Sequence, residues 1–197
     1  MKILGLDFDN TLVDYNNLFH KIALEKQLIK KDTPANKVII RDYLRSVNKE
    51  SEFTILQGEV YGLRILEAND SPEMIKTLNA LNKKGVKMYL VSHKTQFPYK
   101  GPKYDLRDAA LKWLEAKGFF EKNGLNWHMS QIHFESTKEE KIRKIVELGC
   151  THYIDDLPEI LTMLPNHIKK IHFNPYVSNT KHEFQQLKCW SKLKNGI

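Results

Sequence analysis

The sequence predicts an α/β fold: a doubly wound, Rossmann-like parallel sheet with a small, mainly helical insertion after its first strand. Short apolar runs of β-forming residues alternate along the chain with segments of helical periodicity. Acidic or hydroxyl side chains follow directly after several of the apolar runs. This alternation favours parallel strands joined by helical crossovers, and such sheets bind ligands at the carboxyl ends of their strands.

The composition is that of a globular protein with room for a substantial core. The chain has 197 residues, of which 41% are hydrophobic and 28% are charged. It contains no apolar run long enough for a membrane span, and Met1-Lys2 leads directly into the first apolar run, so we expect no removable leader. The two cysteines, Cys150 and Cys189, lack C-x-x-C spacing, which favours free thiols in a reducing compartment. We therefore predict a cytoplasmic protein without a membrane partner.

The net charge of +7 allows two interpretations. A basic protein can bind nucleic acid or phosphorylated substrates. However, the lysines are scattered and acidic residues lie among them, without an arginine-rich run or a basic stripe interleaved with aromatic residues. A solvated basic surface is the favoured interpretation, and nucleic acid remains the alternative partner.

The first fourteen residues, MKILGLDFDNTLVD, organise the chain. Residues 3–6 predict a buried strand that ends at Asp7 and Asp9, with Asn10 and Thr11 starting a turn. Carboxylates two positions apart extend from the same side of an extended chain. Two like charges this close need a cation between them, and hard oxygen ligands suit Mg²⁺. The alternative is a pair of surface aspartates in a turn.

The next segment predicts the insertion. Residues 13–48 show helical periodicity, interrupted by the turn at 32–34. Residues 52–66 mix apolar residues with two glycines and predict a short hairpin or a loop. We therefore divide the chain into a core formed by 1–12 and 69–197 and an inserted cap formed by 13–68.

The chain after residue 85 supplies three further strand ends or helix starts with polar residues. Residues 86–91 predict a strand that ends at Ser92, and His93, Lys94 and an irregular loop containing Lys100 follow it. We expect this loop at the rim of the site, where it would hold the polar part of a substrate. A solvated loop with incidental charge is the alternative.

A helix is predicted to begin at residues 136–140, where Thr137 and Glu140 fit a capping box. Lys138 lies in its first turn, and a cation there opposes the helix dipole, which indicates that it faces a carboxylate or a phosphate. Residues 151–154 predict another strand, which ends at Asp155 and Asp156. Residues 168–173 predict the last strand, and 174–197 a polar, lysine-containing tail.

The residues Asp7-Phe8-Asp9-Asn10-Thr11-Leu12 resemble the first motif of the haloacid dehalogenase-like (HAD) superfamily of phosphohydrolases. The resemblance implies that Asp7 is the nucleophile and Asp9 the general acid and base. It also implies that Ser92 is the hydroxyl of the second motif, which binds the phosphoryl group. Lys138 matches the lysine of the third motif, with Lys141 one turn on as the alternative.

The acidic residues after the 151–154 strand resemble the fourth motif. Asp155 is the preferred ligand of a magnesium ion, with Asp156 adjacent and Glu159 four residues on. The ion would then be held by Asp7, the backbone carbonyl of Asp9, Asp155 and Asp156.

The resemblance implies a Mg²⁺-dependent phosphomonoester hydrolase that works through an aspartyl-phosphate. A second Asp in the first motif favours phosphoryl transfer, because the dehalogenase members lack it. The small cap implies a small phosphorylated metabolite, such as a sugar phosphate or a nucleotide. The expected substrate-binding residues are Thr11, Ser92, His93, Lys94 and Lys100. The alternatives are a phosphatase for nucleic-acid ends and a binding or regulatory protein that keeps the fold without turnover.

Overall fold

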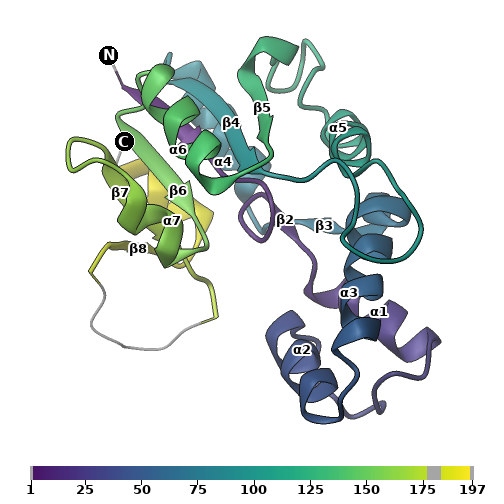
Figure 1. The fold of residues 1–197 in the computed structure, drawn as a ribbon. Coiled ribbons are helices and arrows are strands. Elements are labelled where there is room, and N and C mark those ends of the chain that lie inside the picture. Colours follow the sequence, from purple (N-terminus) through teal and green to yellow (C-terminus); the bar gives the residue numbers. More distant parts are fainter. Residues whose placement is uncertain (1, 177–182, 196–197) are drawn as a thin grey trace. The chain divides into compact units, whose positions relative to one another are not determined.

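The computed structural model of the protein describes residues 2–176 and 183–195, and its chain divides into two compact units (Figure 1). The core unit comprises residues 1–13, 70–94 and 118–197, and the insertion unit comprises residues 14–69 and 95–117. The short strands β2 (Val13–Asp14) and β3 (Asn69–Asp70) pair with each other where the chain passes from one unit to the other and back.

The core unit is built on a six-stranded sheet with the order β5-β4-β1-β6-β7-β8, and every neighbouring pair is parallel. Its strands are β1 (Ile3–Leu6), β4 (Lys87–His93), β5 (Ile132–Glu135), β6 (His152–Asp155), β7 (Lys169–Phe173) and β8 (Gln185–Leu187). From β1 the chain runs outward through β4 to β5, and then returns to the other side of β1 for β6. The predicted α/β fold with a doubly wound parallel sheet is confirmed.

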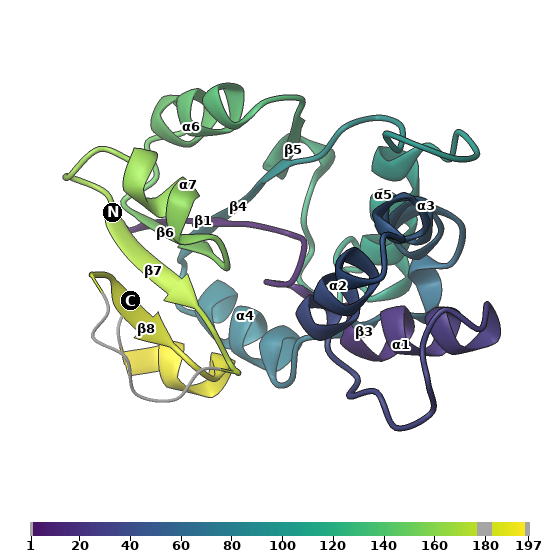
Figure 2. The same ribbon diagram turned by 60° about the horizontal axis from the view of Figure 1, so that its bottom comes forward.

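Helices cover both faces of this sheet. The helices α6 (Lys138–Glu147) and α7 (Pro158–Met163) lie on one face, and α4 (Met74–Lys83) lies on the other with the 3₁₀ segment η4 (Trp190–Asn195) (Figure 2). A further 3₁₀ turn, η3 (Met129–Gln131), precedes β5. Between the sheet and α6 and α7 lies a cluster of buried residues, which includes Val91, Ile145, Tyr153 and Ile160. Burial of this apolar surface fixes which way each strand faces, and therefore which polar residues emerge at the strand ends.

The polar tail predicted after residue 173 is corrected by the structure. Residues 185–187 add strand β8 to the sheet edge, and η4 follows it. Trp190 is fully buried, and its ring lies 5.5 Å from that of Phe173. These few apolar residues, spread among lysines, were too sparse to show a strand pattern in the sequence. Residues 177–182 of the predicted tail lie outside the described residues.

The insertion unit is helical. Its elements are α1 (Asn16–Glu25), α2 (Lys37–Ser46), α3 (Glu50–Gly58), the π-helix η1 (Glu59–Leu63), the 3₁₀ turn η2 (Ile65–Glu67) and α5 (Leu106–Ala116). Residues 52–66 are helical and not the predicted hairpin or loop. Phe19 stacks on Phe53, and Tyr15 contacts Tyr61, so burial of this aromatic cluster outweighs the local preference of the two glycines.

Residues 95–117 pack within the insertion unit, although the sequence placed them in the core. Two glycines explain why: Gly62 lies against Tyr104, and Gly58 lies against Pro98, so close that a side chain at either position would collide. The buried Trp113 of α5 also donates a hydrogen bond from its Nε1 to the carbonyl oxygen of Ala68. These contacts join segments far apart in sequence, and no local pattern reports them.

Candidate active site

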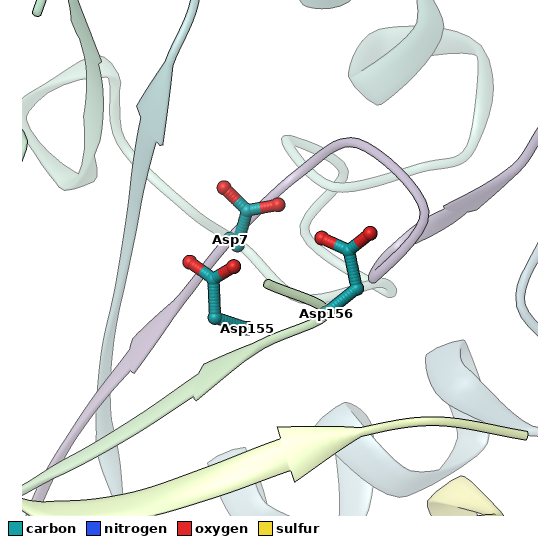
Figure 3. Close-up of side chains that lie close together, drawn as sticks. All are labelled: Asp7, Asp155 and Asp156. Carbon is teal, nitrogen blue, oxygen red and sulfur yellow. The ribbon is translucent and has the colours of Figure 1, made fainter. Parts of the chain in front are cut away.

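Three carboxylates meet at the carboxyl ends of β1 and β6 (Figure 3). The register explains the meeting: Leu6 pairs with Ile154, so Asp7 and Asp155 leave neighbouring strands side by side, and the Asp7 N–H donates to the Ile154 carbonyl oxygen. One oxygen from each of Asp7, Asp155 and Asp156 lies within 4.8 Å of the others. The strand order reverses at β1, with β4 on one side and β6 on the other, so these residues lie where a doubly wound sheet binds its ligand.

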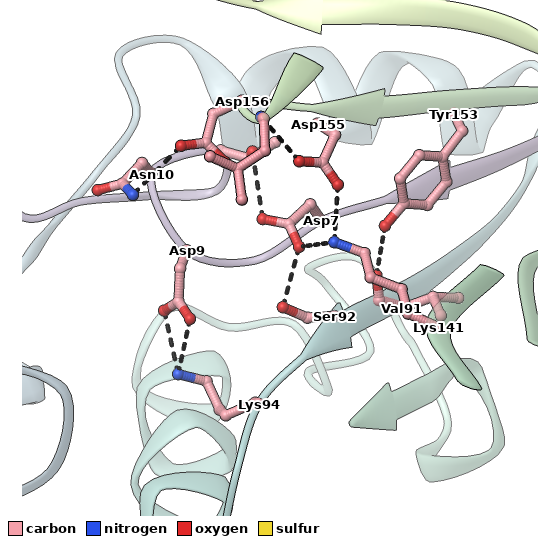
Figure 4. Close-up of polar contacts among 12 residues, drawn as sticks. Asp7, Asp9, Asn10, Val91, Ser92, Lys94, Lys141, Tyr153, Asp155 and Asp156 are labelled. Carbon is pink, nitrogen blue, oxygen red and sulfur yellow. Dashed lines mark hydrogen bonds and ion pairs between the residues drawn. The ribbon is translucent and has the colours of Figure 1, made fainter. Parts of the chain in front are cut away.

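Lys141 bridges two of these carboxylates (Figure 4). Its Nζ lies 2.6 Å from Asp7 Oδ1 and 2.7 Å from Asp155 Oδ2, and its side chain is 2% exposed. Burial opposes the charged form of this lysine, but the two carboxylates outweigh burial and raise its pKa. Lys141 therefore brings a fixed positive charge to Asp7.

Of the two lysines that the resemblance to the third motif left open, Lys141 contacts Asp7 and the preferred Lys138 pairs with another carboxylate. The Lys138 Nζ pairs with Glu159 Oε1 at 2.7 Å on the surface, with the lysine side chain 35% exposed. Positions 138, 141 and 145 share one face of a helix, so the two lysines differ in their place along α6 and not in its phase. Lys138 is the first residue of the helix and its side chain is partly exposed, whereas Lys141 lies one turn further on and is buried. The sequence therefore left the choice between the two lysines open.

Ser92 and Thr11 also contact Asp7, and both side chains are buried. Ser92 Oγ donates to Asp7 Oδ1 at 3.0 Å, and Thr11 Oγ1 lies 3.4 Å from Asp7 Oδ2. Ser92 comes from the end of β4, which pairs with β1 directly. The structure therefore brings both hydroxyls together with Asp7, and their role in substrate binding stays a prediction.

Asp9 pairs with Lys94. The Lys94 Nζ lies 3.0 Å from both carboxylate oxygens of Asp9, and the lysine side chain is 2% exposed while that of Asp9 is 24% exposed. The sequence predicted that Lys94 binds substrate and did not indicate this partner, which lies 85 positions away in the chain.

The structure adds one residue that the sequence prediction omitted. Asn10 Nδ2 donates to Asp156 Oδ2 at 3.3 Å, and Asn10 has a positive φ of 56°. Asn adopts this left-handed conformation more readily than most residues, so its place in the turn after Asp9 was the available signal.

The two remaining residues that the sequence predicted for the site are His93 and Lys100. His93 Nε2 lies 3.0 Å from the carbonyl oxygen of Ser136, the residue before the α6 capping box. Lys100 is an exposed residue of the insertion unit, so its role in substrate binding stays a prediction.

The electrostatics of the carboxylates favour a cation at this site. Burial raises the pKa of Asp155, the nearby Lys141 lowers it and the charge of Asp7 raises it again, and the net effect is a raised pKa. Lys94 pairs with Asp9, and Lys141 pairs with Asp7 and Asp155. Asp156 accepts a hydrogen bond from Asn10, so the two lysines face more carboxylates than they can neutralise when all are ionised. Hard oxygen donors with this excess charge fit one divalent cation such as Mg²⁺.

Comparison with known proteins agrees with this fold. No protein-family model matches the chain. It is 23% identical over 199 residues to a Bacillus cereus protein named "Putative nucleotidase". The alignment covers 98% of this chain and 96% of that protein.

Solved structures of HAD hydrolases match the fold over almost the whole chain. A HAD family hydrolase from Deinococcus radiodurans with bound phosphate and sodium has a TM-score of 0.61 at 14% identity, covering 100% of this chain and 94% of that chain. The "putative HAD-hydrolase YfnB" from Bacillus subtilis, bound to magnesium, has a TM-score of 0.63 at 13% identity, covering 98% of this chain and 97% of that chain. The chain therefore has the fold of the HAD-superfamily hydrolases, as the resemblance in its first motif predicted. Among the described residues, none of the helices has the length and hydropathy needed to cross a membrane.

Proposed function

We propose that this chain, which has the HAD hydrolase fold, is a Mg²⁺-dependent phosphomonoester hydrolase acting on a small phosphorylated metabolite. The observation that carries the proposal is the environment of Asp7, which contacts a buried lysine and a buried serine hydroxyl and lies beside two further carboxylates. A carboxylate can attack phosphorus only where the charge of the phosphoryl oxygens is neutralised. Lys141 and a bound divalent cation would supply that charge.

Asp7, Asp155 and Asp156 would hold the cation, together with the backbone carbonyl of Asp9. When bound, Mg²⁺ would neutralise phosphoryl charge and orient the substrate. The acidic triad supports this part of the proposal, as does the magnesium bound to the Bacillus subtilis hydrolase of the same fold.

Each side chain at the site would have a different role in the reaction. A carboxylate oxygen of Asp7 would attack phosphorus, and the bond from phosphorus to the ester oxygen would break. Asp9 would give a proton to the departing oxygen and later take one from the water that attacks the aspartyl-phosphate. Ser92 and Lys141, which both donate to Asp7 Oδ1, lie close enough to the nucleophile that they would also donate to the oxygens of the phosphoryl group.

Nucleotides are the favoured substrate class. The support is the similarity over nearly the full chain to the Bacillus cereus protein named as a putative nucleotidase. We also predict that the insertion unit acts as a cap and determines which substrate is bound. The cytoplasmic location is a separate prediction.

The test is phosphate release from a panel of nucleoside monophosphates, sugar phosphates and end-phosphorylated oligonucleotides, with Mg²⁺ and with a chelator. We expect Mg²⁺-dependent release from a small-metabolite class and none with the matched variant Asp7→Asn. Preference for oligonucleotides, with a steep loss of binding as salt rises, would favour the nucleic-acid alternative. Equal release by the wild type and Asp7→Asn would exclude Asp7 as the nucleophile. Mg²⁺ binding without turnover of any substrate would favour a regulatory role.

A further inference from the structure

Lys94 is a buried residue whose side chain contacts Asp9, the proposed general acid and base. Both its backbone and its side chain are held by hydrogen bonds. Its backbone N–H donates to the carbonyl oxygen of Glu135 at the end of β5, with a distance of 2.8 Å. Its side chain reaches Asp9, and its Nζ lies 5.2 Å from the centre of the Phe8 ring. A buried ammonium is costly unless it is paired, and here both oxygens of one carboxylate accept from it (Figure 4).

The two members of this pair differ in exposure, and the difference assigns their roles. The Asp9 side chain is 24% exposed and can meet a substrate or a water molecule, whereas Lys94 is 2% exposed. Asp9 is therefore the member of the pair that solvent reaches. This arrangement argues against the role predicted from the sequence, in which Lys94 contacts the substrate itself.

We propose that Lys94 is a positioning residue for Asp9, an inference that rests on the proposed function. A carboxylate on a short side chain can rotate, and proton transfer requires the proton to point at the departing oxygen. When Asp9 carries the proton, one of its oxygens still accepts from Lys94 Nζ and the other holds the O–H. Lys94 thereby fixes the direction in which the proton is offered. After the transfer, both oxygens accept from Lys94 until one takes a proton from the attacking water.

This role predicts a dependence on the leaving group. An alkyl ester needs protonation of its departing oxygen, whereas p-nitrophenolate leaves without it. Loss of Lys94 should therefore slow the first step for an alkyl phosphate much more than for p-nitrophenyl phosphate. A residue that binds the phosphoryl group, or one that only supports the fold, would affect both substrates equally.

The experiment compares Lys94→Met, Lys94→Arg and wild-type protein, all as full chains with Mg²⁺, on p-nitrophenyl phosphate and on the best nucleoside monophosphate or sugar phosphate. In Lys94→Met we expect kcat/KM for the alkyl ester to fall by about 10²- to 10⁴-fold, the usual contribution of a general acid, with a much smaller fall for the aryl ester. We also expect a burst of p-nitrophenolate, because the aspartyl-phosphate forms but Asp9 activates water poorly. Lys94→Arg should recover part of the activity on the alkyl ester, because a guanidinium also pairs with both carboxylate oxygens.

Equal losses of kcat/KM on the two substrates, without a burst, would overturn the positioning role and leave the proposed function in place. Absence of Mg²⁺-dependent turnover in the wild type would overturn both proposals. If Lys94→Met does not fold, the same comparison of substrates is made with Lys94→Arg and Lys94→Gln, and equal losses there would overturn the role.

Discussion

Replacement of Lys141 by Met tests the charge arrangement at the centre of the site. The side chains have similar length, so the change removes the ammonium with little change in packing. It leaves Asp7 and Asp155 facing each other without the cation that now lies 2.6 Å and 2.7 Å from their oxygens, and both residues are buried. Removal of one partner from a buried ion pair costs about 3–5 kcal/mol, because the remaining charge is left uncompensated.

We expect the metal-free variant to lose about 3–5 kcal/mol in its free energy of unfolding. For a chain of this length that loss lowers Tm by about 6–20 °C. Urea and thermal unfolding followed by circular dichroism in a chelator would measure it. Added Mg²⁺ should recover part of the loss, because a divalent cation supplies positive charge to the same carboxylates and binds only the folded protein.

Lys138→Met is the matched control on the same helix. Its ion pair with Glu159 is exposed, and such pairs contribute about 0–1 kcal/mol. A loss for Lys141→Met that is no larger than the loss for Lys138→Met would refute the reasoning about the buried cation.

Three further predictions concern the scaffold. A Cβ at Gly5 would lie 2.5 Å from a ring carbon of the buried Tyr153, so Gly5→Ala should cost about 1–3 kcal/mol in urea unfolding, and a stable variant would contradict this contact. Burial raises the pKa of Cys150 to about 11, so its thiol stays protonated at pH values at which an ordinary cysteine is already ionised. At about pH 8 an alkylating reagent should therefore modify Cys189 in the native protein, and Cys150 only after denaturation. Asn36 caps α2 by accepting from two backbone N–H groups, and Asn36→Ala should cost about 0.5–2 kcal/mol, with no loss if the cap is unimportant.

Local signals determined much of the fold. Strands β1, β4, β6 and β7 lie within a residue or two of their predicted positions, and Thr137 and Glu140 form the predicted capping box. Short apolar runs, turn residues and caps act over a few residues, so they can be recognised in one sequence. Parallel strands then bring their carboxyl ends together, which is why Asp7, Ser92 and Asp155 could be expected at one edge of the sheet.

Tertiary structure decided the features that depend on contacts between distant segments. Lys138 and Lys141 lie on the same face of α6, and tertiary packing buried Lys141 beside Asp7 while it left Lys138 at the surface. The pairing of Lys94 with Asp9 joins two strand ends 85 positions apart. Packing against Gly58 and Gly62 joined residues 95–117 to the insertion unit. The sequence alone determined which residue types form the site. Long-range packing decided which lysine faces which carboxylate, because local periodicity does not specify these pairings.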